Sequence, residues 1–292
     1  MQGLFTRCFR SIIRGWMMTV WLESIFVILA AFSGVFLGRC LSRIERGVWT
    51  LGFILPLSSI LLLTAVRYIS EPGMLPFFSQ LTTGQPKFII LSFGITMGLG
   101  TLLYRMTHKV KRCIVYIIMI GFVFYFTVLP VVSPALLEKK LLGLETNIDS
   151  DGICLQTTSY TCGPAAAVTA IGQFGLSADE GEMALLSNTS LRGGTLAWSL
   201  HSAIEERYSK DGLKCEYRKF DSVSELGEAG ITLVIVKEGF LLDHWVTVLD
   251  VSEKAVVLGD PGFGKISIKR EVFEKVWRFS GIVLRRVSAQ SI

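Results

Sequence analysis

The stretch Gln156-Thr-Thr-Ser-Tyr-Thr-Cys162-Gly-Pro-Ala-Ala-Ala-Val168 decides how the second half of this chain is interpreted. A polar turn ends at Cys162, and the apolar, alanine-rich segment that follows is typical of a helix. A thiol at the start of a helix lies close to free backbone N–H groups and to the positive end of the helix dipole, and both favour the thiolate. Cys162 is therefore predicted to be a nucleophile if the chain also supplies a histidine and an acid. Otherwise it is a small residue packed under a loop.

The composition divides the 292 residues into two unlike parts. Residues 1–140 contain long uncharged hydrophobic runs, whereas residues 145–292 have the mixed polarity of a soluble domain. The hydrophobic share of 51% is an average over these two parts, so we expect a membrane domain over 1–140 and a soluble domain over 145–292. The net charge of +5 comes largely from Arg and Lys beside the hydrophobic runs. Such placement is expected of membrane segments and argues against a nucleic-acid partner.

Four membrane-spanning helices are predicted after a basic, amphipathic N-terminal segment that we expect to lie at the membrane surface. Each predicted span is a largely apolar run close to the roughly 20 residues needed to cross a bilayer. Gly94 and Gly98 in the third span allow two helices to pack closely, and we expect this packing to occur within one chain. The four spans are 17–38, 48–66, 88–104 and 113–137.

The positive charges on the two sides of the predicted membrane are balanced. The loops 39–47 and 105–112 are densely basic, but equally many Arg and Lys residues lie at the N-terminus, in loop 67–87 and after the last span. The concentration of charge in the shortest loops favours a C-terminal domain outside the cytoplasm. We therefore expect a multi-pass integral protein of a bacterial cell membrane, in contact with the lipid bilayer.

The soluble part is predicted to be an α+β domain, because three helices are followed by strands with short, hairpin-like connections. The first helix runs from near Cys162 to about Phe174. The second follows Ser177-Ala-Asp-Glu180, which matches a capping box, and the third follows Thr195 as its N-cap. The predicted strands are Cys215–Phe220, Thr232–Lys237, Trp245–Val251, Ala255–Leu258, Lys265–Ile268 and Gly281–Leu284.

A histidine and an acid occur at suitable places in this strand region. His244 begins one predicted strand, and Asp260 follows 16 residues later, at the end of the next strand. Neighbouring antiparallel strands can bring such residues together across a hairpin. The chain has three histidines in all, and neither His108, in a basic loop, nor His201, in the middle of a helix, has an obvious chemical context.

The residues Cys162, His244 and Asp260 supply what a cysteine peptidase needs. The histidine accepts the thiol proton and later protonates the amine leaving group, while the acid orients the imidazole ring. The N–H of Cys162 and the side-chain amide of Gln156 can bind the oxyanion of the tetrahedral intermediate. Cys154 is a nearby thiol with no comparable context. Because none of the six cysteines forms a Cys-x-x-Cys pair, neither a zinc ribbon nor a redox motif is supported, and we expect no metal or cofactor.

Taken together, Gln156…Cys162-Gly, His244-Trp-Val-x-Val-Leu and Asp260-Pro-x-x-Gly264 resemble the bacteriocin-processing peptidases, the thirty-ninth family of papain-like cysteine peptidases. The resemblance covers roughly residues 150–285. It implies a papain-like fold with a helical half and an antiparallel sheet. It also implies Cys162 as nucleophile, His244 as base, Asp260 as orienting residue and Gln156 as oxyanion donor. Family members remove leader peptides after a double glycine, and many are fused ahead of an exporter with an ATP-binding cassette.

Two features of this chain differ from the family pattern. The peptidase-like domain follows the membrane spans, and the sequence contains no Gly-x-x-x-x-Gly-Lys-Ser/Thr phosphate loop. We therefore expect a membrane-anchored cysteine peptidase that hydrolyses a peptide or protein precursor, with a separate exporter subunit as a further partner. The alternative is a catalytically inactive module that uses the same cleft to bind a peptide or an exporter at the membrane.

Overall fold

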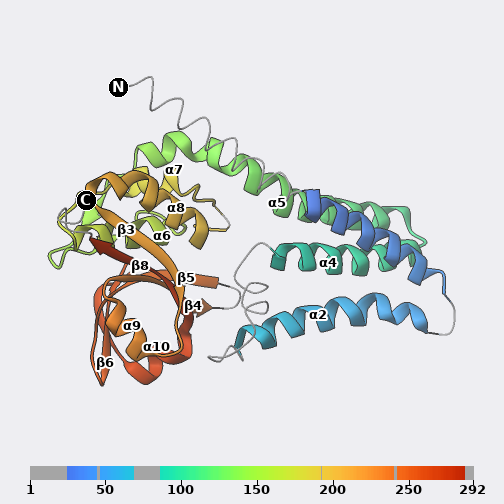
Figure 1. Cartoon of the computed structure of the whole chain (residues 1–292). Coiled ribbons are helices and arrows are strands. Elements are labelled where there is room, and N and C mark those ends of the chain that lie inside the picture. The colour runs from blue at the N-terminus through green and yellow to red at the C-terminus, as the bar shows by residue number, and fades with distance from the viewer. Residues whose placement is uncertain (1–24, 45–46, 69–85, 192, 240–241, 287–292) are drawn as a thin grey trace. The chain divides into compact units, whose positions relative to one another are not determined.

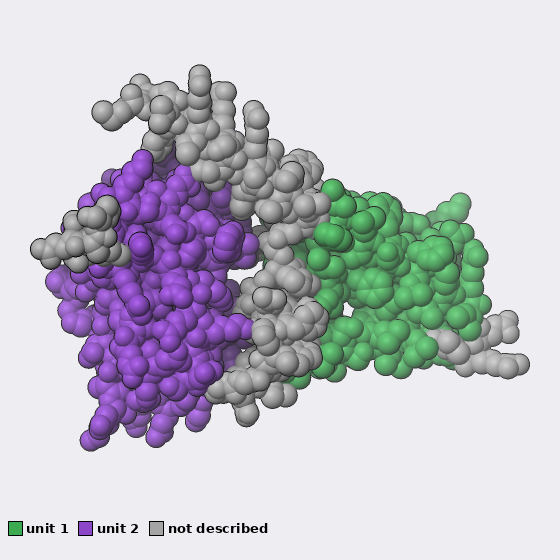
Figure 2. Space-filling model, in the orientation of Figure 1, with its two compact units in different colours: residues 1–69, 75–132 green, residues 70–74, 133–292 purple. Residues whose placement is uncertain are grey.

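A computed structural model describes residues 25–44, 47–68, 86–191, 193–239 and 242–286 (Figure 1). The chain forms two compact units, which Figure 2 shows in green and purple. The first unit comprises residues 1–69 and 75–132, and the second comprises residues 70–74 and 133–292.

The first unit is helical. Its described helices are Ile25–Ser42, α2 (Leu51–Tyr68) after the 3₁₀ turn η1 (Val48–Thr50), α4 (Pro86–Arg105) and the N-terminal part of α5 (Lys109–Leu142). Glycines bring these helices close together: a Cβ on Gly94 would lie 3.4 Å from Cβ of Pro56, and a Cβ on Gly34 would collide with Thr96. Gly94 thus packs against a helix of the same chain, as expected.

Two described helices, rather than the expected four, are long and apolar enough to cross a membrane: Ile25–Ser42 and Phe88–Arg105. The segment 48–66 lies largely in α2, but not all of that helix's side chains belong to the described part of the chain, and the apolar stretch found among those that do, Leu51–Leu62, is shorter than the roughly 20 residues needed. The segment 113–137 is helical, but many of its side chains from residue 127 onward lie outside the described part of the chain. The predicted surface helix at the N-terminus also lies outside it.

The second unit contains a six-stranded sheet in which every neighbouring pair is antiparallel. The strand order is β3-β8-β4-β5-β6-β7, so the last strand of the chain inserts between β3 and β4. Short connections join β5 to β6 and β6 to β7, as the sequence predicted. The strands are β3 (Leu213–Lys219), β4 (Thr232–Gly239), β5 (Leu242–Val251), β6 (Ala255–Asp260), β7 (Gly264–Lys269) and β8 (Trp277–Arg286), and a small ribbon pairs β1 (Asn147–Ile148) with β2 (Cys154–Leu155).

Three helices precede the large sheet, as expected: α6 (Cys162–Gly172), α7 (Glu180–Leu186) and α8 (Ala197–Tyr208). The predicted caps were wrong in detail. The N-cap of α7 is Asp179, whose carboxylate accepts from the N–H of Glu182 at 2.8 Å, and the N-cap of α8 is Leu196. Two short helices that the sequence did not predict follow: α9 (Val223–Ala229) and α10 (Arg270–Val276).

The sheet separates two hydrophobic cores. One contains the buried face of α6 and residues of α8, together with Leu233, Trp245 and Ile282 of the sheet. The other joins α9 and α10 to the opposite side chains of the same strands, among them Val246 and Val248. Strand β5 contributes to both cores and is buried from His244 to Val248, so the start of this strand is fixed from both sides.

Candidate active site

Cys162 lies at the first position of α6, where the sequence placed it. The next nine residues of the helix are all buried, which holds this N-terminus firmly in the core. No side chain caps the helix, and the N–H groups of a first helical turn have no partner in the helix itself. Cys162 is 8% exposed, so its sulfur lies in an environment from which most water is excluded.

A buried carboxylate anchors the loop before Cys162. Glu180, at the start of α7, is fully buried and accepts hydrogen bonds from the Thr157 N–H at 3.0 Å and from the Thr157 hydroxyl. The sequence placed Glu180 in a capping box, but the structure directs its side chain to this loop. Asp179 performs the capping, which leaves Glu180 free to position the loop that carries Gln156.

His244 and Asp260 meet across the hairpin formed by β5 and β6. The Nε2 atom of His244 donates to Oδ1 of Asp260 at 2.9 Å, and the two residues are 8% and 6% exposed. The same carboxylate oxygen accepts from the Gly262 N–H at 2.8 Å, so it is held by the turn after β6 as well. This turn ends at Gly264, whose φ of +80° is readily adopted by glycine.

His244 also interacts with Cys162. Burial by itself lowers the pKa of His244, but hydrogen bonds to Asp260 and Cys162, together with their charges, raise it to about 10. Because Nε2 is bonded to Asp260, the remaining ring nitrogen, Nδ1, is the one available to the sulfur. These interactions favour the protonated imidazole, which links the cysteine to the aspartate.

Gln156 is placed beside the turn that carries Asp260. Its backbone N–H donates to the Pro261 carbonyl at 2.9 Å, so the loop before α6 and the turn after β6 are joined directly. The side-chain Oε1 of Gln156 is buried and has no hydrogen-bond partner in the described structure. A buried side-chain oxygen without a partner is uncommon in folded proteins, and a catalytic role is one of its known explanations.

A neighbouring aromatic residue ties this region to the helical half. Trp245, next to His244 in β5, donates its indole N–H to the Thr195 carbonyl at 3.0 Å, and both residues are buried. Thr195 was expected to cap α8, but its hydroxyl instead lies 2.6 Å from that of Thr189. The loop before α8 is thereby fixed against the strand that carries His244.

The other described thiols of the second unit differ from Cys162. Burial raises the pKa of Cys154 to about 12, and the nearby carboxylates of Glu180 and Asp179 contribute to this rise. Burial and the charge of Glu205 have the same effect on Cys215, whose pKa is also about 12. Both remain protonated at neutral pH, and neither is bonded to the His244–Asp260 pair.

Comparisons with known families and proteins find relatives of the second unit. Residues 151–290 match the model of the peptidase C39 family. Two archaeal relatives, both uncharacterized, are covered over nearly their whole length. One, from Methanothermobacter thermautotrophicus, is 30% identical over 143 residues, which cover 49% of this chain and 94% of the relative. The other, from Methanothermobacter marburgensis, is 27% identical over 147 residues, which cover 50% of this chain and 97% of the relative.

The solved structures that match parts of this chain include two peptidase domains of transporters. The peptidase domain of Streptococcus ComA, a bi-functional ABC transporter of a quorum-sensing pathway, is 22% identical, with a TM-score of 0.40 over 46% of this chain and 96% of that one. A double-glycine-motif protease from an AMS/PCAT transporter, solved in complex with the leader peptide, is 16% identical, with a TM-score of 0.39. The match covers 49% of this chain and 93% of that protease chain.

Proposed function

Because this chain belongs, through residues 151–290, to the peptidase C39 family, we propose that its second unit is a cysteine peptidase that cleaves a peptide or protein precursor. Cys162 is the nucleophile, His244 the acid and base, and Asp260 the residue that orients the imidazole. The observation that supports this most strongly is the position of His244, which bonds to Asp260 through Nε2 and whose pKa is raised by both Asp260 and Cys162.

The reaction begins from a thiolate and an imidazolium. The thiolate of Cys162 attacks the scissile carbonyl carbon, and the resulting oxyanion is bound by the Cys162 N–H and the side-chain amide of Gln156. When the C–N bond breaks, His244 gives its proton to the departing amine. Neutral His244 then takes a proton from water, the hydroxide attacks the thioester, and release of the acid restores the thiolate.

The substrate is limited by where the domain is held. The two membrane-type helices, Ile25–Ser42 and Phe88–Arg105, precede the peptidase in the same chain. We therefore place the enzyme at a membrane, where it acts on peptides that reach the bilayer surface. Precursors with a double-glycine leader are the first substrate class to test, and a separate exporter subunit is the partner that would deliver or remove them.

The test uses the full-length chain in native membranes or detergent. An iodoacetamide-based probe should label Cys162 in the wild type, and the labelled peptide that contains residue 162 should be missing from the Cys162→Ala variant, in which the exposed Cys40 and Cys113 can still react. A panel of precursor peptides should include matched double-glycine and double-alanine leaders. Cleavage should be lost in Cys162→Ala and retained in Cys154→Ala, because the Cys154 thiol is buried and protonated.

Two results would contradict the proposal. Cleavage that persists in Cys162→Ala would remove this cysteine as the nucleophile. Absence of cleavage across the panel, combined with measurable binding of a peptide, would favour the alternative of a catalytically inactive peptide-binding module.

A further inference from the structure

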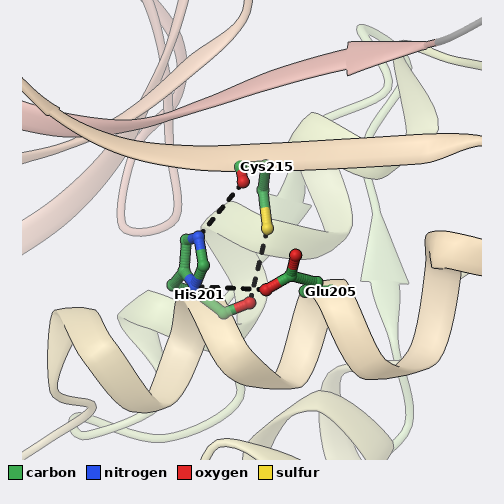
Figure 3. A group of neighbouring side chains, drawn as sticks. All are labelled: His201, Glu205 and Cys215. Carbon is green, nitrogen blue, oxygen red and sulfur yellow. Dashed lines mark hydrogen bonds and ion pairs between the residues drawn. The ribbon is translucent and has the colours of Figure 1, made fainter.

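A second group of chemically active side chains lies on α8 and β3, outside the Cys162–His244–Asp260 set (Figure 3). His201 and Glu205 are four residues apart on α8 and therefore project from the same face of the helix. Cys215 comes from β3, which runs alongside this helix. One ligand atom of each residue, nitrogen, oxygen and sulfur, lies within 4.8 Å of the other two.

One ring nitrogen of His201 is hydrogen-bonded, and the other is available to a ligand. The Nε2 atom lies 3.1 Å from the Cys215 carbonyl oxygen, and a carbonyl only accepts, so Nε2 is the donor. In the neutral ring, Nδ1 then has a lone pair. This atom is buried, has no hydrogen-bond partner in the described structure, and lies 3.8 Å from Oε2 of Glu205.

The orientation of this ring is fixed independently of any ligand. Trp198 stacks on His201 with ring centres 5.8 Å apart and planes 16° from parallel. A backbone carbonyl bonded to one ring nitrogen is also the arrangement that commonly orients a metal-binding histidine toward its metal. The His201 ring is thus held in place by its neighbours. The side chain of Glu205 is 59% exposed and is therefore free to change its conformation when an ion binds.

We propose that His201 Nδ1, Glu205 and Cys215 Sγ bind a divalent transition-metal ion of the zinc class. Zinc accepts nitrogen, sulfur and carboxylate oxygen at about 2.0–2.3 Å, which separates the ligand atoms of a tetrahedral site by roughly 3.5 Å. His201 Nδ1 and Glu205 Oε2, at 3.8 Å, are already close to this separation, and all three ligand atoms lie within 4.8 Å of one another. Three protein ligands leave a fourth position for water, on the side where Glu205 is exposed.

Binding involves the exchange of one proton. The Cys215 thiol donates to the His201 carbonyl at 3.4 Å, and a bound metal ion would replace that proton, which passes to solvent. The ion then joins α8 to β3 through bonds stronger than this thiol contact. A ligand that binds only the folded protein stabilises it, so we assign this site a role in holding the helical half against the sheet.

The test measures metal binding in the full-length chain carrying Cys162→Ala, because the active-site thiol and imidazole would also take up zinc. Added Co²⁺ should give the visible bands of a tetrahedral site and a thiolate-to-metal charge-transfer band. Added Zn²⁺ should displace the cobalt spectrum and raise the thermal midpoint. The charge-transfer band should disappear in Cys215→Ser.

Surface variants keep the test valid if Cys215→Ser fails to fold. Glu205→Gln changes an exposed side chain, and we expect it to weaken zinc affinity by at least about tenfold. Glu206→Gln, on the next residue of the same helix, should leave affinity unchanged. The proposal is overturned if Glu205→Gln binds zinc as tightly as the control Glu206→Gln, both made in the Cys162→Ala parent. It is also overturned if the cobalt spectrum lacks a thiolate band.

Discussion

His244 Nε2 lies 2.9 Å from Asp260 Oδ1, and that same oxygen also accepts the Gly262 N–H at 2.8 Å. One carboxylate atom therefore orients the imidazole and closes the turn after β6. Because both residues are almost fully buried, water competes little for this oxygen, and the electrostatic interaction is stronger than it would be at the surface.

Asp260→Asn should lower kcat/KM for peptide cleavage by roughly 10²–10⁴-fold. The amide oxygen of asparagine can still accept from Gly262, which preserves the turn, but the negative charge that stabilises the imidazolium of His244 is lost. Steady-state kinetics on a cleaved precursor peptide measure the effect. Asp250→Asn, at an exposed position of β5, is the control and should change the rate little. An unchanged rate in Asp260→Asn would exclude Asp260 as the orienting residue.

The alkaline side of the pH–rate profile should report His244. Its pKa is raised from 6.5 to about 10, so the imidazolium that protonates the leaving amine is present at neutral pH and is lost as the pH rises through about 10. We expect kcat/KM to fall over that range. In Asp260→Asn the fall should begin at lower pH, since the hydrogen bond and charge of Asp260 are among the causes that raise the pKa. A fall that starts at the same pH in both proteins would contradict this assignment.

The sequence predicted the features of the second unit that depend on local pattern. All six strands of the large sheet form where alternating or buried apolar runs occur, and α6 begins at Cys162 as expected. The hairpin between β5 and β6 followed from a short connection, and this connection is what brings His244 and Asp260 together. The same pattern predicted a helical half followed by a sheet half, and the resemblance to a known family added that this α+β fold is papain-like.

The features that the sequence did not predict are very short helices and contacts between residues far apart in the chain. The helices α9 and α10 have seven residues each, too few for a clear helical periodicity. The pairing of His201 with Cys215 joins a helix to a strand, and no spacing rule predicts it. Of the four expected membrane spans, 48–66 and 113–137 stay predictions, because both include residues whose side chains lie outside the described part of the chain.

Trp245→Phe should lower the free energy of unfolding by about 1–3 kcal/mol, because the buried Thr195 carbonyl would lose its hydrogen-bond donor. Denaturant unfolding of the full-length chain, followed by a signal from the second unit, measures the change. Trp198→Phe is the matched control, since Trp198 is 73% exposed and should cost about 0.5 kcal/mol or less. Equal effects of the two substitutions would show that the hydrogen bond to Thr195 contributes nothing.

Two glycines of α6 should respond in opposite ways to the same substitution. In a helix interior, Gly→Ala usually stabilises by roughly 0.5–1 kcal/mol because alanine loses less conformational freedom on folding. A Cβ on Gly172 would meet open space, with no neighbouring atom within 4 Å, so Gly172→Ala should be neutral or stabilising. At Gly163 the added Cβ would lie 2.8 Å from Cβ of Thr195 and 3.2 Å from the Trp245 ring.

Neither neighbour of Gly163 can move freely, because Thr195 and Trp245 are buried and hydrogen-bonded to each other. Gly163→Ala should therefore destabilise the domain by about 1–3 kcal/mol, the usual cost of overpacking a core, and should also shift Cys162 relative to His244. Thermal or denaturant unfolding gives the stability change, and the labelling rate of Cys162 reports the displacement. If Gly163→Ala were as stable as Gly172→Ala and labelled at the wild-type rate, close packing beside the nucleophile would not explain why glycine follows the cysteine.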